Sequence, residues 1–218
     1  GSSGIYNPGK RYWQKVRKLC TDNNILLIAD EVMSGFGRTG KWFAVNHYDI
    51  TPDIITIAKG MTSGYAPLGG VITTKEISNY FDKNMFQCGM TYSSHPLSLA
   101  ACLGTLEVYE DEKLIEQAAL KGEYLLSKLE GLQEKHSIIR EIRGTGLHLV
   151  IDLQAKDGTP LTPWNKPANE KMKGIVSKMR ANGLLGLTRW NWVFVTPPLT
   201  ITTSEIDQII DLLDDSLK

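Results

Sequence analysis

The chain has 218 residues, and its 24 lysines and arginines are balanced by 24 aspartates and glutamates, so the formal net charge is zero. This balance gives no support to a nucleic acid or an anionic membrane as the main partner. The composition is ordinary for a globular protein, and no apolar run reaches the roughly eighteen residues that a membrane span needs.

The cysteines and histidines bear on the cellular setting and on metal binding. Cys20, Cys88 and Cys102 are an odd number and lack CxxC spacing, which indicates neither a disulfide framework nor a zinc knuckle. The four histidines show no metal-ligand spacing. We therefore expect a reducing, cytoplasmic setting and no metal.

The first part of the chain alternates between helix and strand patterns and carries two glycine-rich turns. Its apolar strands are continuous runs, which are typical of a parallel sheet with both faces buried. This order of elements predicts an α/β fold. The expected ranges are a helix over 8–24, strands over 25–29, 53–58 and 69–74, and glycine-rich turns over 34–40 and 60–65.

The pattern changes after a long helical stretch over 96–136, in which a break is expected near Asp111 or Gly122. Ser204 with Asp207 is a helix-start signature for the closing helix. We place a boundary near residue 106, between a largely parallel α/β part and a small α+β part. The expected ranges are strands over 138–143 and 147–152, a loop over 156–167, a helix over 168–182, strands over 184–189 and 192–196, and a helix over 204–218.

Two of the predicted strands end on charges of opposite sign, Asp30 and Lys59. Singly, each is more typical of a helix cap or a solvated strand end. Both, however, lie between an apolar strand and a glycine-rich turn, and ligands of open α/β sheets bind outside the carboxyl ends of the strands. A lysine that forms a Schiff base and a carboxylate that pairs a pyridinium nitrogen suit pyridoxal phosphate.

Three segments resemble the class III (omega-) aminotransferases, pyridoxal-phosphate enzymes of fold type I. Residues 26–40 (LLIADEVMSGFGRTG) are similar to the family's pyridine-nitrogen segment. Residues 52–60 (PDIITIAKG), continued by 63–69 (SGYAPLG), resemble its Schiff-base lysine segment. Residues 89–96 (GMTYSSHP) are near its Thr-Tyr/Phe-Ser-Gly-His-Pro signature. The resemblance covers essentially the whole chain.

The resemblance implies the aspartate aminotransferase fold, a pyridoxal 5'-phosphate cofactor, and a homodimer or higher oligomer with a shared active site. Residues 1–106 would be the C-terminal part of the large cofactor-binding domain, with a mostly parallel sheet. Residues 107–218 would be the small C-terminal α+β domain. The chain would thus be the C-terminal half of a subunit, whose missing front half carries the phosphate loop and an aromatic residue that stacks on the cofactor.

The same resemblance gives roles to five residues. Lys59 would hold the cofactor as a Schiff base and move the proton, and Asp30 would keep the pyridine nitrogen protonated. Val32 would lie against one face of the ring. Thr91 would donate its hydroxyl to the cofactor phosphate of the neighbouring subunit. Arg189, ahead of a Pro-Pro pair, would clamp a substrate carboxylate.

The implied reaction is a transamination from an omega-amino acid or amine to a 2-oxo acid, and the 63–69 segment favours pyruvate as the acceptor. A lyase, decarboxylase or aminomutase of the same family remains an alternative. A truncated, non-catalytic fragment is another.

Some positions depart from the family or stay open. Ser94 replaces a usual glycine and Met90 a usual histidine.

Residues 1–4 (GSSG) could be an expression scar, but we favour a native loop and a partial sequence. Arg143 is assigned a structural role. Trp190 could line a pocket, although packing against a strand is the favoured interpretation.

Overall fold

The computed structural model describes residue 1 and residues 3–218, which form two compact units. One unit is Pro8–Ile115, and the other joins Gly1–Asn7 to Glu116–Lys218. The predicted boundary near residue 106 lies within helix α3 (Pro96–Asp111), whereas the division between the units comes later, inside helix α4 (Leu114–Lys135). Within the described residues, no helix has both the length and the apolar character needed to cross a membrane.

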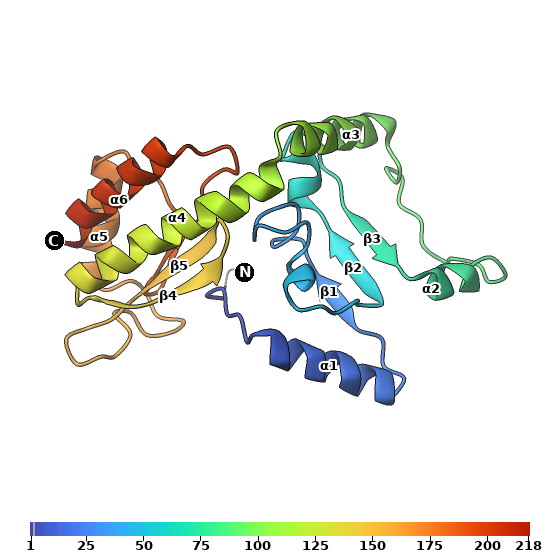
Figure 1. Cartoon of the computed structure of the whole chain (residues 1–218), viewed down its shortest axis with the longest axis horizontal. Helices are drawn as coiled ribbons and strands as arrows, with labels where there is room; N and C mark the ends of the chain where they lie inside the picture. The colour runs from blue at the N-terminus through green and yellow to red at the C-terminus, as the bar shows by residue number, and fades with distance from the viewer. Residues whose placement is uncertain (2) are drawn as a thin grey trace. The chain divides into compact units, whose positions relative to one another are not determined.

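The Pro8–Ile115 unit is built on a three-stranded sheet in the order β1 (Ile28–Asp30), β2 (Ile54–Ile57), β3 (Gly70–Thr73). Helix α1 (Lys10–Asp22) precedes β1 (Figure 1). Strands β1 and β2 are parallel, and β3 is antiparallel to β2. A parallel return needs a crossover, usually a helix, but the connection from β2 to β3 holds only a 3-10 turn and a loop.

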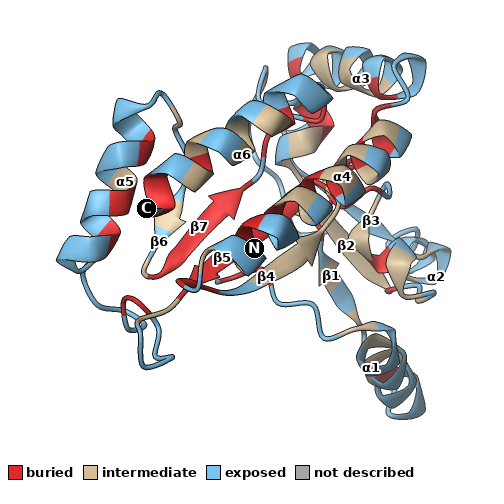
Figure 2. Ribbon diagram, turned by 60° about the vertical axis from the view of Figure 1, so that its left-hand side comes forward, coloured by how far each residue is buried: buried red, intermediate tan, exposed pale blue. Residues whose placement is uncertain are grey.

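The prediction that these strands are buried on both faces is wrong for the described residues. Ile28 of β1 is 59% exposed and Val71 of β3 is 63% exposed. Figure 2 shows this sheet in the colours of intermediate and exposed residues, without the red of buried ones. The apolar runs correctly predicted a sheet, but its apolar side chains are only partly covered by the described residues, since Val71 and Ile72, on opposite faces, are both exposed.

The predicted break in the long helical stretch lies at Asp111 and not at Gly122. Helix α3 ends at Asp111, and Lys113 adopts a left-handed φ of 50° before α4 begins. That backbone conformation cannot continue a right-handed helix. The short helix α2 (Lys75–Tyr80) was not predicted, because its six residues are too few for a helical periodicity.

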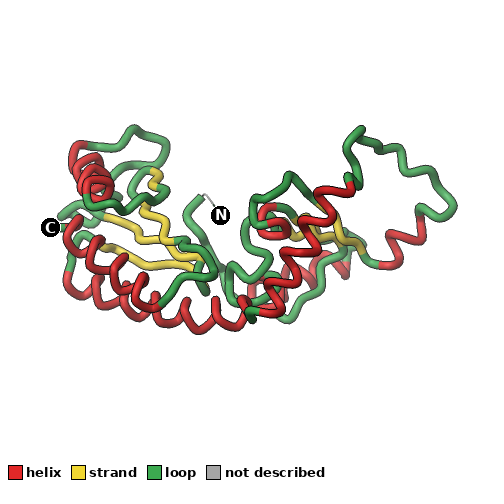
Figure 3. The backbone as a smooth tube through the Cα atoms, turned by 90° about the horizontal axis from the view of Figure 1, so that it is seen from above, coloured by secondary structure: helices red, strands yellow, loops and turns green. Residues whose placement is uncertain are grey.

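The second unit contains a four-stranded antiparallel sheet in the order β4 (Ile139–Thr145), β5 (His148–Leu153), β7 (Trp192–Val195), β6 (Thr188–Arg189). Figure 3 shows α4 running along this sheet. Strands β5 and β7 are buried throughout, in contrast to the sheet of the other unit (Figure 2). The other helices of this unit are α5 (Glu170–Ala181) and α6 (Thr203–Leu217).

Helix α4 presents one buried stripe, because its buried residues recur every three or four positions. Gly122 lies in this stripe, and a Cβ atom there would come within 2.4 Å of the backbone of Gly146 in the β4–β5 turn. The glycine therefore lets the helix approach that turn closely. The stripe consists of Ile115, Ala118, Gly122, Leu125, Leu129 and Leu132.

The helix-start signature predicted at Ser204 and Asp207 is wrong by two residues. The N-cap of α6 is Thr202, whose hydroxyl accepts a hydrogen bond from the Glu205 backbone N–H at 3.2 Å. The Glu205 carboxylate in turn accepts the Thr202 N–H at 2.8 Å, which completes a capping box. Asp207 instead accepts a hydrogen bond from the Tyr124 hydroxyl on α4.

Asp214 on α6 is expected to make the stability of the chain depend on pH. Its carboxylate accepts hydrogen bonds from Lys135 and His136, and these partners lower the pKa of Asp214 from 3.8 to about 2. Because the folded-state pKa is lowered, the stabilisation is present above 3.8 and is lost as the pH falls towards about 2. Asp214→Asn should therefore flatten the pH dependence of the free energy of unfolding in this window.

Urea unfolding at a series of pH values measures this effect. Asp211→Asn, on the same helix, is the matched control, because Asp211 makes no ion pair among the described residues. Superimposable pH profiles for Asp214→Asn and the unmodified chain would contradict the prediction.

Candidate active site

Asp30 ends strand β1, where its partner in the sheet register is Thr56 of β2. Its Oδ1 atom accepts hydrogen bonds from the Val32 backbone N–H at 3.0 Å and from the Thr56 hydroxyl at 3.2 Å. Both bonds engage the same oxygen, so among the described residues Oδ2 has no hydrogen-bond partner. The side chain is exposed. One oxygen thus fixes the carboxylate, and the other is available to accept an N–H from a ligand.

Lys59 follows strand β2 directly and begins the 3-10 helix η2 (Lys59–Thr62). Its backbone adopts a φ of 48°, in the left-handed region that glycine favours. The side chain is exposed, and its amine makes no hydrogen bond or ion pair with a described residue. Strained conformations of this kind concentrate at functional sites, where the surrounding structure enforces them.

The backbone next to Lys59 is held by two aromatic residues. A Cβ atom on Gly60 would lie 2.8 Å from Cβ of Phe36, so only glycine fits this contact without a shift. The Tyr109 hydroxyl, from α3, donates a hydrogen bond to the Gly60 carbonyl oxygen at 3.1 Å. Phe36 belongs to the first glycine-rich turn, so the structure packs the two glycine-rich turns of the sequence against each other.

Glu31, the residue after Asp30, is only 2% exposed. Its carboxylate accepts the backbone N–H groups of Ala44 at 3.0 Å and Val45 at 2.9 Å, and the Ser34 hydroxyl at 2.5 Å. It thereby caps the 3-10 helix η1 (Ala44–His47) and closes the loop that follows Asp30. Sequence reasoning missed this role, for which the only signal was an acid placed against a glycine-rich turn.

Replacing Glu31 with glutamine should destabilise the unit by about 1–3 kcal/mol, because an amide presents one acceptor oxygen where the carboxylate presents two. One of the buried donors then loses its partner. The free energy of unfolding in urea measures this cost. Glu107→Gln makes the same exchange at an exposed position of α3 and should stay within about 0.5 kcal/mol of the unmodified chain. Equal effects of the two variants would refute the capping role.

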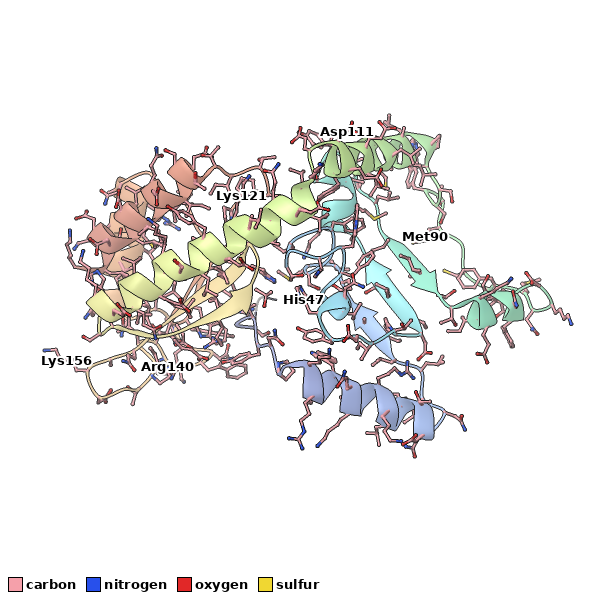
Figure 4. The ribbon with its side chains drawn as sticks, viewed as in Figure 1. His47, Met90, Asp111, Lys121, Arg140 and Lys156 are labelled. Atoms are coloured by element: carbon pink, nitrogen blue, oxygen red, sulfur yellow. The ribbon has the colours of Figure 1, made fainter. Side chains whose placement is uncertain are left out.

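The structure places Val32 and Thr91 in different surroundings. Val32 is half-buried beside Asp30, to which its N–H donates. Thr91 lies in an exposed turn in the connection between α2 and α3, next to Met90, which Figure 4 labels. Ser94 in the same turn has a φ of 54°, a conformation that glycine adopts without strain. This explains why a glycine is usual at that position of the resembled motif.

Arg189 belongs to the other unit, where it ends the short strand β6. Its guanidinium lies over the ring of Trp190, 4.3 Å from the ring centroid. The tryptophan expected to pack a strand therefore also contacts the arginine expected to bind substrate.

Among the described residues, no three His, Cys, Asp or Glu side chains come together as a metal site. Cys20, Cys88 and Cys102 are free thiols.

The arrangement of Asp30 and Lys59 defines a class of site. Their strands are parallel neighbours, so both residues lie at the carboxyl edge of one sheet. No ion pair joins the two side chains, so the carboxylate of Asp30 and the amine of Lys59 are both available to a ligand. An aromatic cofactor with a ring N–H and an aldehyde matches this donor set, as in the pyridoxal-phosphate transferase fold.

Comparison with known proteins agrees with this class. The family profile for "Aminotransferase class-III" matches residues 1–217. A putrescine–pyruvate aminotransferase of Pseudomonas aeruginosa is 36% identical over 220 residues, which cover 97% of this chain and 46% of that protein. A taurine–pyruvate aminotransferase of Rhodobacter capsulatus is 35% identical over 232 residues, covering 99% of this chain and 49% of that protein. The chain therefore belongs to the class-III aminotransferase family.

Solved structures confirm the predicted α/β fold. A taurine:2-oxoglutarate aminotransferase of Bifidobacterium kashiwanohense, in complex with PLP and glutamate, is similar with a TM-score of 0.94 at 37% identity, over 100% of this chain and 49% of that one. An S-selective transaminase of Arthrobacter sp. gives a TM-score of 0.90 at 39% identity, over 96% and 48% of the two chains. The chain thus spans about half the length of the relatives it matches.

Proposed function

We propose that the protein carrying this chain is a pyridoxal-phosphate-dependent transaminase, which moves an amino group from an omega-amino acid or amine to a 2-oxo acid. The observation that carries the proposal is the pair at the sheet edge, where neighbouring parallel strands lead to an exposed Lys59 side chain and to an Asp30 carboxylate with one open oxygen. Two relatives are named for putrescine or taurine with pyruvate, and one similar solved structure is named for taurine with 2-oxoglutarate. Of these two 2-oxo acids we propose pyruvate as the acceptor.

The residues present fit the cofactor. The Lys59 amine would bind it covalently, and Oδ2 of Asp30 would accept the hydrogen bond of the ring nitrogen while Thr56 and Val32 hold Oδ1. Bound pyridoxal phosphate supplies a ring that accepts electrons when a C–H bond next to the substrate amine is broken. The Lys59 amine would take up that proton and return it to the carbon on the other side of the substrate nitrogen, which is a 1,3-proton shift.

The remaining parts of the proposal concern the second subunit and the substrate. Val32 would support one face of the cofactor ring. Thr91 would bind the cofactor phosphate of a neighbouring subunit in a homodimer or higher oligomer, which suits its exposed position. Arg189 would bind the substrate carboxylate. The free thiols suit the expected cytoplasmic location, and neither nucleic acid nor a membrane is proposed as a partner.

The test is an amino-transfer assay with pyridoxal phosphate, using putrescine, taurine and 5-aminovalerate as donors and pyruvate or 2-oxoglutarate as acceptor. The proposal predicts formation of alanine or glutamate that depends on both substrates. A product that forms from the donor without a 2-oxo acid would instead indicate the lyase, decarboxylase or aminomutase alternative. Absence of an imine absorbance band after addition of pyridoxal phosphate would favour a non-catalytic fragment.

A further inference from the structure

We propose that Trp190 is a positioning residue that holds the Arg189 guanidinium ready for a substrate carboxylate. The inference rests on the proposed function, because it takes Arg189 as the group that binds the carboxylate. The indole of Trp190 lies against the guanidinium at 4.3 Å. Stacking of this kind engages the face of the guanidinium, whereas a carboxylate pairs with N–H groups at its edge.

The backbone at Trp190 supports a positioning role. Residues 190 and 191 form the turn between β6 and β7, in which Arg189 pairs with Trp192. Trp190 has a φ of 54°, a conformation that a bulky side chain adopts only at a cost. Asparagine or glycine would suit this position better if the turn only had to reverse the chain. The strained tryptophan therefore indicates that its side chain is needed beside Arg189.

Asn191 anchors the turn to the buried sheet. It is 4% exposed, and its side-chain amide donates to Oδ1 of Asp152 at 2.6 Å and to the Leu153 carbonyl at 3.1 Å. Asp152 is fully buried and also accepts hydrogen bonds from Arg140, which Figure 4 labels, and from Arg143, both at 2.7 Å. A carboxylate held by two arginines cannot follow a moving loop, so the turn and its strained residue are fixed in place.

The indole of Trp190 is itself held between two others. Its ring centroid lies 5.4 Å from that of Trp164 and 5.0 Å from that of Trp192, and the second pair meets edge to face at 74°. Trp190 also packs against a core cluster that includes Val150 and Phe194. These contacts restrict rotation of the Trp190 ring. The arginine side chain that stacks on it is therefore ordered before the substrate arrives, so less conformational entropy is lost when the substrate binds.

The arrangement predicts a preference for carboxylate-bearing substrates over uncharged amines. A guanidinium that is already oriented can form a bidentate pair with a carboxylate at a smaller entropic cost. An alkylamine without a carboxylate gains nothing from this arrangement. Trp190 should thus affect the selectivity between the two classes of amino donor.

The direct test uses the 218-residue chain and needs no turnover. In a ¹H–¹⁵N spectrum, the Arg189 Nε–H resonance, assigned by its loss in Arg189→Lys, should show the ring-current shift of a stacked guanidinium. Trp190→Leu should abolish that shift, and Trp190→Phe should retain part of it. Titration with propionate should give a dissociation constant about 2- to 30-fold higher for Trp190→Leu, the range of one cation–π contact, with partial rescue by Trp190→Phe.

A kinetic test with the holoenzyme follows the ratio of KM for 5-aminovalerate to KM for butylamine, which should rise in Trp190→Leu. An unchanged propionate dissociation constant in a folded Trp190→Leu, or an equal rise in both KM values, would overturn the proposal. So would propionate binding that Arg189→Lys does not weaken. Failure of amino transfer with the spectral and propionate results intact would refute the proposed function but not the positioning of Arg189 by Trp190.

Discussion

Replacing Lys59 with alanine is expected to eliminate covalent binding of pyridoxal phosphate and to reduce amino transfer to background. The physical reason is that the Lys59 amine is the exposed, unengaged nucleophile at the edge where β1 and β2 end. Its loss removes both the group that holds the cofactor and the base that moves the proton. Absorbance of the imine band and formation of alanine from pyruvate measure the two losses separately.

Two variants serve as controls for Lys59→Ala. Lys59→Arg keeps the positive charge but cannot condense with an aldehyde, so it should fail in the same way. Lys75→Ala removes another exposed lysine of the same unit and should retain both readouts. Full activity in Lys59→Ala would overturn the assignment of the site.

Replacing Gly144 with alanine is expected to destabilise the C-terminal unit by about 4 kcal/mol, and by more if the hairpin cannot relax. Gly144 has a φ of 130°, and a Cβ atom there would lie 2.0 Å from the carbonyl oxygen of His148 and 2.9 Å from Cα of Leu149. These are backbone atoms of β5, which cannot move without breaking the pairing of β4 with β5. The cost therefore combines backbone strain with overpacking.

Two other glycines separate the contributions. Gly158→Ala has a φ of 81° and nothing within 4 Å of the added Cβ, so it tests the backbone strain alone. Gly131→Ala lies in α4 with open space and no unusual φ, and it tests the effect of adding a methyl group. In urea unfolding, Gly144→Ala should lower the free energy of unfolding by much more than either of the other two variants. If Gly144→Ala and Gly158→Ala lowered the free energy of unfolding equally, the close approach of Gly144 to the backbone of β5 would not constrain this position.

Much of the local structure could be predicted from the sequence, because periodicity and turn residues report on it directly. The apolar spacing of α4 and the alternation of helix with strand before residue 106 are examples. The exposure of Ile28 could not be predicted, since an apolar run does not say whether another element covers it. The antiparallel pairing of β3 with β2 was also not predicted. It follows from the lack of a crossover helix between the two strands, which the pattern of each strand alone does not report.

Some residues of the candidate site could likewise be predicted from the sequence, and others could not. Asp30 and Lys59 could be found because each follows an apolar strand and precedes a glycine-rich turn. Glu31 and Asn191 could not be found, because their roles depend on partners far away in the sequence, such as Val45 and Asp152. The contact of Trp190 with Arg189 depends on a backbone conformation that residue preferences argue against.

The most direct test of the central claim is to treat the protein with pyridoxal phosphate and borohydride and to map the modified peptide by mass spectrometry. Borohydride reduces the imine to a stable amine, so the position of the cofactor is recorded covalently. We expect one pyridoxyl group on the peptide that contains Lys59, and its absence in Lys59→Arg. A pyridoxyl group held on another lysine, or no stable modification at all, would contradict it.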